Sequence, residues 1–236
     1  MLRRVLAPIH PDGWKFIAAA ALATLVLFFL WRPLGWAALI LTLWMAYFFR
    51  DPWRVTPTRR GLIVSPADGI VVALGPAPPP PELAMGTAPV PRIGIFLNLF
   101  DVHVARTPVG GRVLARRYTK GRFVNASLDK ASTDNERLAI RIGAADQPDS
   151  AADNMPDIAF VLIAGLVARR IVCPVYEGQV LAQGERIGLI RFGSRVDVYC
   201  PPPYVPLVAL GQRMVAGETV LADRQSSEPA GEGVAH

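Results

Sequence analysis

The sequence predicts a mainly β domain of the α+β class, with barrel-sandwich-like β-hairpins, preceded by an N-terminal hydrophobic helical hairpin. Three observations lead to this fold class. Residues 16–31 and 34–49 are two apolar runs without a charged side chain. From Gly61 onward, short runs rich in Val, Ile and Leu alternate with Gly and Pro, which is typical of strands and turns. The chain has 236 residues, 52% of them hydrophobic, and can therefore form one sizeable core beside an anchor.

The two apolar runs predict a helical hairpin, because only Arg32 and Pro33 separate them. Each run is somewhat shorter than the roughly 20 residues that cross a hydrocarbon core. A spanning hairpin and an interfacial hairpin therefore both stay open, and a buried hairpin of a soluble protein is the third alternative. The first run ends in Phe-Leu-Trp-Arg-Pro rather than in a small-residue cleavage site, so we expect the segment to be retained.

The basic residues that flank the hairpin predict that it lies at a membrane. Arginines and lysines flank it on both sides, at Arg3, Arg4, Lys15, Arg50, Arg54, Arg59 and Arg60. The positive-inside tendency then predicts that both flanks are cytoplasmic, next to anionic lipid. The formal net charge is +6, but we find no motif that reads nucleic acid and expect no such partner.

The remaining chain predicts one domain and a tail. We expect an anchor over 1–60, a strand-rich domain over 61–224 and a disordered tail over 225–236. Within the domain, Gly75–Pro81 (GPAPPPP) and Ala144–Asp157 are expected as loops, and the apolar run Val161–Val167 fits a strand or a helix equally well. Two cysteines are too few for a disulfide framework or a zinc site, so we expect buried thiols and no metal.

The pair Gly193-Ser194 lies between two strand-like runs. Glycine permits a strained backbone and a close approach, so the Ser194 hydroxyl could attack the Gly193 carbonyl and turn the amide into an ester. A Gly-Ser pair is also an ordinary feature of a bulge or a hairpin turn. The pair alone therefore decides nothing.

Two further segments give the pair a context. Gly184–Tyr199 (GERIGLIRFGSRVDVY) resembles the self-processing site of the phosphatidylserine decarboxylase family. Val64–Ile70 (VSPADGI) resembles that family's Ser-Pro-Ala-Asp-Gly element, and the resemblance assigns Asp68 to the charge relay that supports self-cleavage. A Pro-Ala-Asp-Gly β-turn would arise from the same four residues.

Phe96–Gly111 (FLNLFDVHVARTPVGG) resembles the family's segment with two histidines. His103 falls on the first histidine and Arg106 on the second, so the proton-transfer role falls to His103 and the role of Arg106 stays open. The Asp-Val-His-Val-x-Arg form is similar to a short, archaeal-type branch of the family. Phe123–Leu138 resembles a further family stretch, which implies head-group binding by Asn125 and Arg137, with Arg106 as an additional candidate.

The resemblance implies a membrane-bound lyase. The chain would cut itself between Gly193 and Ser194, giving a large subunit and a small subunit that begins with a pyruvoyl group made from Ser194. This covalent cofactor would form a Schiff base with the amine of phosphatidylserine and serve as the electron sink for loss of CO2, which leaves phosphatidylethanolamine. A homo-oligomer is possible in this family.

Three alternatives stay open. The same chemistry on archaetidylserine would use the same head-group motifs. A non-enzymatic, membrane-anchored carrier-like β module would keep an intact chain, but Lys15, Lys120 and Lys130 lack the hairpin-turn context of a carrier lysine. A serine hydrolase using Ser194 would lack the glycines on both sides of its nucleophile that the elbow motif requires.

Overall fold

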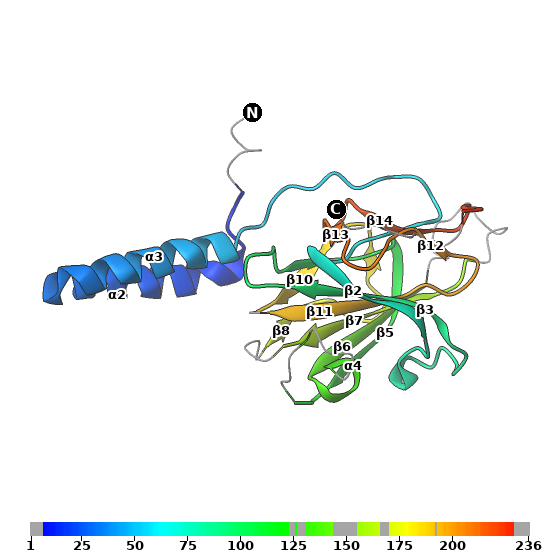
Figure 1. Ribbon diagram of the computed structural model, residues 1–236. Coiled ribbons are helices and arrows are strands. Elements are labelled where there is room, and N and C mark those ends of the chain that lie inside the picture. Colours follow the sequence, from blue (N-terminus) through cyan, green and yellow to red (C-terminus); the bar gives the residue numbers. More distant parts are fainter. Residues whose placement is uncertain are drawn as a thin grey trace.

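The structure is a computed structural model that describes residues 7–122, 126, 131–143, 155–165, 170–191 and 193–228. A pair of long helices projects from a β domain (Figure 1). The helical elements are η1 (Pro11–Gly13), α2 (Trp14–Leu30), α3 (Arg32–Phe48), η2 (Pro81–Leu83) and α4 (Ala131–Asp134). The predicted class, a mainly β domain behind a hydrophobic helical hairpin, is confirmed.

Helices α2 and α3 form the hairpin and are apolar on nearly all sides. Thr24 and Thr42 share a hydrogen bond of 2.9 Å between the helices, and Gly35 lets α3 approach Phe28 of α2. Most other side chains face outward, and Phe29 is 97% exposed. Among the described residues, Pro11–Leu30 is long and apolar enough to cross a membrane. Such a helix pair has the composition of a membrane anchor, because water would not favour so much exposed apolar surface.

The β domain contains three antiparallel sheets. The largest has eight strands in the order β13-β2-β3-β11-β7-β6-β5-β9, and the two small ones have the orders β1-β14-β12 and β4-β10-β8. Their bounds are β1 (Leu62–Val64), β2 (Gly69–Ala77), β3 (Val90–Leu97), β4 (Val104–Arg106), β5 (Gly111–Thr119), β6 (Arg137–Gly143), β7 (Ile158–Ala164), β8 (Ile171–Val172), β9 (Val180–Leu181), β10 (Arg186–Ile190), β11 (Ser194–Tyr199), β12 (Val205–Pro206), β13 (Arg213–Met214) and β14 (Val220–Asp223).

The large sheet is covered on both faces. One face of the large sheet packs in the main core against side chains of both small sheets, for example Ile63 of β1 and Ile187 of β10. Leu83 of η2 and Ala131 of α4 pack in a second cluster with Val161 and Tyr199. Because β11 lies near the middle of the sheet, all six of its residues are buried. The result is the predicted sandwich-like domain.

Two local expectations need comment. Gly75–Ala77 is not loop but the end of β2, paired with Val90–Arg92 of β3. Strand β13 pairs only with the start of β2, so the far end of β2 is an edge of the sheet. Pro76 is tolerated at this edge because its missing N–H removes no hydrogen bond between strands. The ambiguous run from Val161 belongs to strand β7 up to Ala164.

Other expectations fall partly outside the described residues. This applies to 144–154 of the polar loop, to 166–169 after β7 and to 229–236 of the tail. Both cysteines are free and buried, as predicted.

The junction between hairpin and domain is a packed interface. Phe48 and Phe49 at the end of α3 are fully buried and pack against Val102, Val104 and Leu189. The extended segment that follows runs over the domain to β1 (Figure 1). The division at residue 60 stays a prediction, and the contacts of Phe48 and Phe49 place the hairpin's last turn in the domain's packing.

Candidate active site

Ser194 is the first residue of β11 and is completely buried. It lies opposite Leu97 of β3 and Ala164 of β7, with strands on both sides. Its Oγ atom has no hydrogen-bond partner among the described residues. Leaving a buried hydroxyl unpaired costs about 1–3 kcal/mol, so this position calls for an explanation other than stability.

Gly193, immediately before it, has a left-handed backbone with φ of +69°. Its carbonyl oxygen accepts a hydrogen bond of 3.1 Å from the Gly165 N–H, and its own N–H donates to Nε2 of His103 at 3.2 Å. A Cβ atom on Gly165 would lie 2.4 Å from the Gly193 oxygen. The peptide that joins Gly193 to Ser194 is therefore fixed by a backbone donor that only glycine at position 165 can bring so close.

His103 binds the N–H of Gly193, which belongs to the preceding peptide. Its Nδ1 lies 3.0 Å from the Asp101 carbonyl oxygen, which only accepts, so the ring proton sits on Nδ1 and Nε2 is an acceptor. Burial lowers the pKa of His103 to about 4, and the nearby Arg50 charge acts in the same direction. The Phe48 ring packs over the imidazole, with ring centroids 4.3 Å apart. His103 is thus a neutral base at neutral pH.

Asp68 lies at the same end of the sheet, but among the described residues its carboxylate makes no hydrogen bond with His103 or Ser194. Ile70 pairs with Phe96 and Ser194 with Leu97, so Asp68, just before β2, is about two strands away. Its carboxylate accepts hydrogen bonds from Arg54 and from the Ala216 N–H. Burial raises the pKa of Asp68, and these two donors oppose the shift.

Arg106 is engaged by main-chain carbonyls. Its guanidinium donates to the carbonyl oxygens of Gly184 at 2.9 Å and Pro52 at 3.1 Å, and it lies 3.6 Å from the Asp51 carboxylate. Burial lowers its pKa. These contacts tie the segment after α3 to β4, and substrate binding by Arg106 stays a prediction.

Arg137 lies on the opposite face of the sheet from Ser194. It pairs with Ile163, which in turn pairs with Arg195, so these three side chains share a face that alternates with that of Ser194. Its guanidinium donates to Glu82 at 2.9 Å and to the Ser132 carbonyl at 3.1 Å. The structure therefore does not bring Arg137 together with Ser194, and the predicted Asn125 lies outside the described residues.

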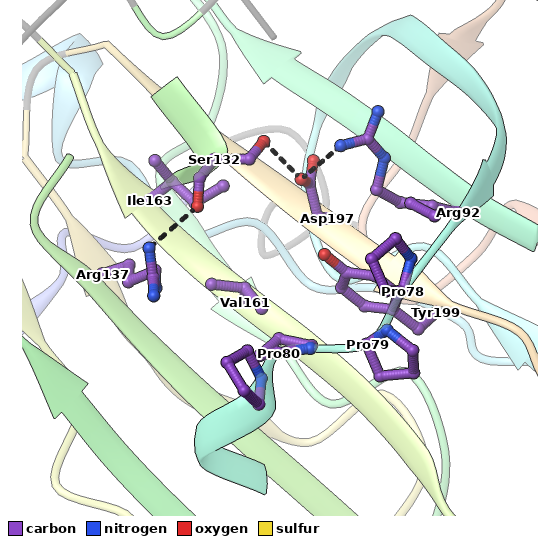
Figure 2. A pocket seen from close by; sticks show the side chains of 12 residues that line it. Pro78, Pro79, Pro80, Arg92, Ser132, Arg137, Val161, Ile163, Asp197 and Tyr199 are labelled. Carbon is purple, nitrogen blue, oxygen red and sulfur yellow. Dashed lines mark hydrogen bonds and ion pairs between the residues drawn. The ribbon is translucent and has the colours of Figure 1, made fainter. Parts of the chain in front are cut away.

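A pocket does open on that opposite face (Figure 2). Arg92, Ser132, Arg137, Asp197 and Tyr199 line it, beside the proline run Pro78–Pro81. Asp197 lies 3.8 Å from Arg92 and accepts a hydrogen bond of 2.7 Å from Ser132. Ser132 and Arg92 hold Asp197 on this face, whereas the Gly193 carbonyl accepts its hydrogen bond from Gly165.

Sequence reasoning did not identify Gly165 or Phe48, and it assigned Arg54 to the membrane flank. Nothing in the sequence distinguishes Gly165 among 20 glycines, and Phe48 is one of many apolar residues in its run. Arg54 was visible as a charge, but its pairing with Asp68 depends on tertiary structure.

A buried serine after a left-handed glycine, with a held carbonyl and a neutral histidine at that glycine, combines the groups that nucleophilic catalysis requires. Comparison with known proteins then identifies the family. A sequence model of phosphatidylserine decarboxylases matches residues 41–222, more than two thirds of the chain. The chain belongs to the phosphatidylserine decarboxylase family.

Curated relatives support this assignment over nearly the whole length. A phosphatidylserine decarboxylase proenzyme of Cereibacter sphaeroides is 55% identical over 235 residues, which cover 100% of this chain and 98% of the relative. Proenzymes of the same name from Paramagnetospirillum magneticum and Beijerinckia indica are 55% and 54% identical, over 96% and 97% of this chain and 91% and 94% of theirs. The name proenzyme says that these relatives are made as precursors.

Proposed function

We propose that this protein is a phosphatidylserine decarboxylase that cuts itself between Gly193 and Ser194 and makes phosphatidylethanolamine and CO2. The observation that carries the proposal is the buried, unpartnered Ser194 Oγ beside a carbonyl that Gly165 holds. The family and its proenzyme names supply the reaction class.

The residues present fit a pyruvoyl group derived from Ser194. Such a group needs a serine whose hydroxyl is free to react, a preceding residue with unusual backbone freedom, and a base nearby. Ser194, Gly193 and His103 meet these three needs. The group would end at the start of β11, held between β3 and β7.

In the first step, Ser194 Oγ attacks the Gly193 carbonyl carbon. The amide bond breaks, an ester forms, and the hydroxyl proton passes to the released Ser194 nitrogen. Negative charge develops on the Gly193 oxygen, where the Gly165 N–H already donates. A donor fixed in advance at such an oxygen is worth roughly 10²–10³ in rate.

In the second step, a base removes the Cα proton of Ser194 and the Gly193 carboxylate leaves. Addition of water and loss of ammonia convert the resulting dehydroalanine to the pyruvoyl end. His103 is our candidate for this base, because its Nε2 is unprotonated and contacts Gly193. The low pKa of His103 keeps it in this form across the neutral range.

When present, the pyruvoyl group supplies a carbonyl that condenses with the substrate amine and accepts the electrons released by loss of CO2. The chain's own residues exclude water and deliver protons. The Phe48 ring covers His103, which is the candidate to take a proton from water at Nε2 and pass it to the product carbon. We assign Asp68 a positioning role: with Arg54 it fixes the segment that leaves the hairpin beside His103.

The hairpin would hold this site at the cytoplasmic face of the cell membrane. Arginines follow α3, and Arg50 is among them. Two arginines of this flank are used inside the protein, since Arg54 pairs with Asp68 and Arg59 with Asp223. The proposed orientation therefore depends mainly on Arg50, Arg60 and the basic N-terminus.

The test is intact mass spectrometry of the full-length protein purified from membranes, wild type beside Ser194→Ala. We expect two wild-type fragments, the smaller one lighter by one ammonia than a fragment with an N-terminal serine, and one uncut Ser194→Ala chain of 25.6 kDa. Ser132→Ala is the matched control, because the Ser132 hydroxyl binds Asp197 on the other face, and it should still cut. An uncut wild-type chain would refute the proposal, and release of CO2 from phosphatidylserine by the cut protein completes it.

A further inference from the structure

The turn between β3 and β4 presents two apolar side chains to the outside. Phe100 is 64% exposed and Leu99 is 37% exposed. Three residues further along the chain, His103 is fully buried at the candidate active site. One short segment therefore links an exposed apolar tip to the reacting peptide.

The turn is rigid rather than loosely attached. The Phe100 N–H donates to the Asn98 side chain at 2.7 Å, and the Asp101 carboxylate accepts from the Asn98 N–H at 2.9 Å. Arg213 binds the same carboxylate at 2.8 Å. Because the backbone is fixed, Leu99 and Phe100 are held outward without a further loss of conformational entropy on binding.

The tip is joined directly to the base of the helical hairpin. Arg50, two residues after α3, donates to the Phe100 carbonyl oxygen at 2.7 Å and to the Tyr47 carbonyl at 2.8 Å. The Arg50 guanidinium also lies over the Tyr47 ring, 3.7 Å from its centroid. The apolar tip is thus continuous with the end of the hairpin that adjoins the domain.

This end of the hairpin has the composition of a membrane–water interface. Trp14 and Lys15 begin α2, Tyr47 lies in the last turn of α3, and Arg50 follows that helix. Trp14 is 59% exposed and Tyr47 is 48% exposed. Aromatic and basic side chains concentrate at this depth of a bilayer, where the rings meet the head groups and the cations meet lipid phosphates.

We propose that Leu99 and Phe100 enter the interface of the same bilayer that holds the hairpin, as a second membrane contact next to the active site. This inference rests on the proposed function, since it explains how a lipid substrate reaches a fully buried serine. With the tip in the lipid, the segment that carries His103 lies at head-group level. The serine head group can then reach the site while the acyl chains stay in the membrane.

A label at the tip tests the lipid contact without using activity. Phe100→Cys in the full-length Ser194→Ala chain is labelled with an environment-sensitive fluorophore, since Cys173 and Cys200 are buried. In vesicles of phosphatidylcholine and phosphatidylserine, we expect a blue shift and quenching by nitroxide lipids. Tyr176→Cys is the matched control, because Tyr176 is 65% exposed and precedes the edge strand β9, and its label should remain unquenched. An unquenched label at position 100 would refute the proposal.

Activity provides the second test. In the double variant Leu99→Ser/Phe100→Ser, we expect normal chain cleavage, a roughly tenfold higher KM for phosphatidylserine in vesicles, and unchanged kcat/KM for monomeric short-chain phosphatidylserine. Tyr176→Ser should match the wild type on both substrates. An equal loss on both substrates or wild-type activity on vesicles would each overturn the inference. Failure of the wild type to cut itself would instead refute the proposed function, while the label still reports on lipid contact.

Discussion

The two faces of strand β11 contain different kinds of buried polar group. On one face, the Ser194 hydroxyl has no partner among the described residues. On the other, Arg195 and Asp197 are equally buried, but Arg195 Nε donates to the Asp197 carboxylate at 2.5 Å. Ser132 adds a hydrogen bond of 2.7 Å to Asp197. A single strand thus holds one polar side chain without a described partner and, one residue later, a pair that is satisfied.

The Arg195–Asp197 pair bears on the stability of the fold, whereas the Ser194 hydroxyl bears on the proposed reaction. A buried ion pair that is fully hydrogen-bonded keeps its geometry, and removing one partner leaves a buried charge unpaired. An unpaired buried hydroxyl next to a held carbonyl lowers stability but is free to attack. We therefore expect substitutions on the Arg195 face to change the free energy of unfolding, and substitutions around Ser194 to change the rate of chain cleavage.

The largest effect is expected for Asp197→Ala. The Arg195 guanidinium would then be buried without its carboxylate, which costs about 3–5 kcal/mol of unfolding free energy. Denaturant unfolding of the full-length protein in detergent, in the uncut Ser194→Ala background, measures this. The double change Arg195→Met/Asp197→Leu should recover most of the loss, since neither charge remains. If Asp197→Ala is as stable as its parent, the two faces do not differ as described.

The substitution Gly165→Ala tests the surroundings of Ser194, on the other face of β11. A Cβ atom 2.4 Å from the Gly193 oxygen would push away the N–H that holds this carbonyl. We expect chain cleavage to slow roughly 10²-fold, in the range for loss of one oxyanion donor. The accumulation of fragments after synthesis, followed by mass spectrometry, gives the rate. Gly75→Ala is the control for backbone strain remote from the site: its φ is +157° and a Cβ there meets no atom within 4 Å, so cleavage should continue. Cleavage at the wild-type rate in Gly165→Ala would contradict the assignment.

The effect that is smallest near neutral pH is a pH dependence that comes from His103. Its pKa is about 4 in the folded protein and near 6.5 in the unfolded chain, so the folded state binds fewer protons between these values. The stability that a neutral His103 contributes is complete above pH 6.5 and is lost as the pH falls toward 4, by about 3 kcal/mol in total. Thermal unfolding of Ser194→Ala between pH 4 and 8 measures the slope. His103→Gln should flatten it, and an unchanged slope would show that other groups are responsible.

Much of the fold could be predicted from the sequence because local patterns determine it. Two charge-free apolar runs around Arg32-Pro33 became α2 and α3, and the Val-, Ile- and Leu-rich runs became strands. The end of β2 was missed because a proline-rich run reads as a loop. Pro76 is accommodated only because the far end of that strand lies at an edge, which depends on how far β13 extends.

The candidate site also contains residues that local motifs predict and residues that only the fold places. Ser194, Gly193 and His103 could be proposed from their motifs, and the fold joins them through the Gly193 N–H bond to His103 Nε2. Arg137 could not be placed, because a strand alternates its side chains and the register of three strands decides which face Arg137 occupies. Asp68 could not be linked to its actual partner, Arg54, since that ion pair joins the linker to the start of a strand.

The sequence by itself determined the class of fold, the hydrophobic hairpin and the family motifs, because composition and short-range spacing encode all three. Only the tertiary structure decided which groups contact Gly193, the residue before the proposed cut. Gly165 and His103 reach it from strand ends that are far apart in the chain, and Phe48 reaches His103 from the membrane hairpin. Such contacts depend on sheet register and on packing at the junction, which no local pattern specifies.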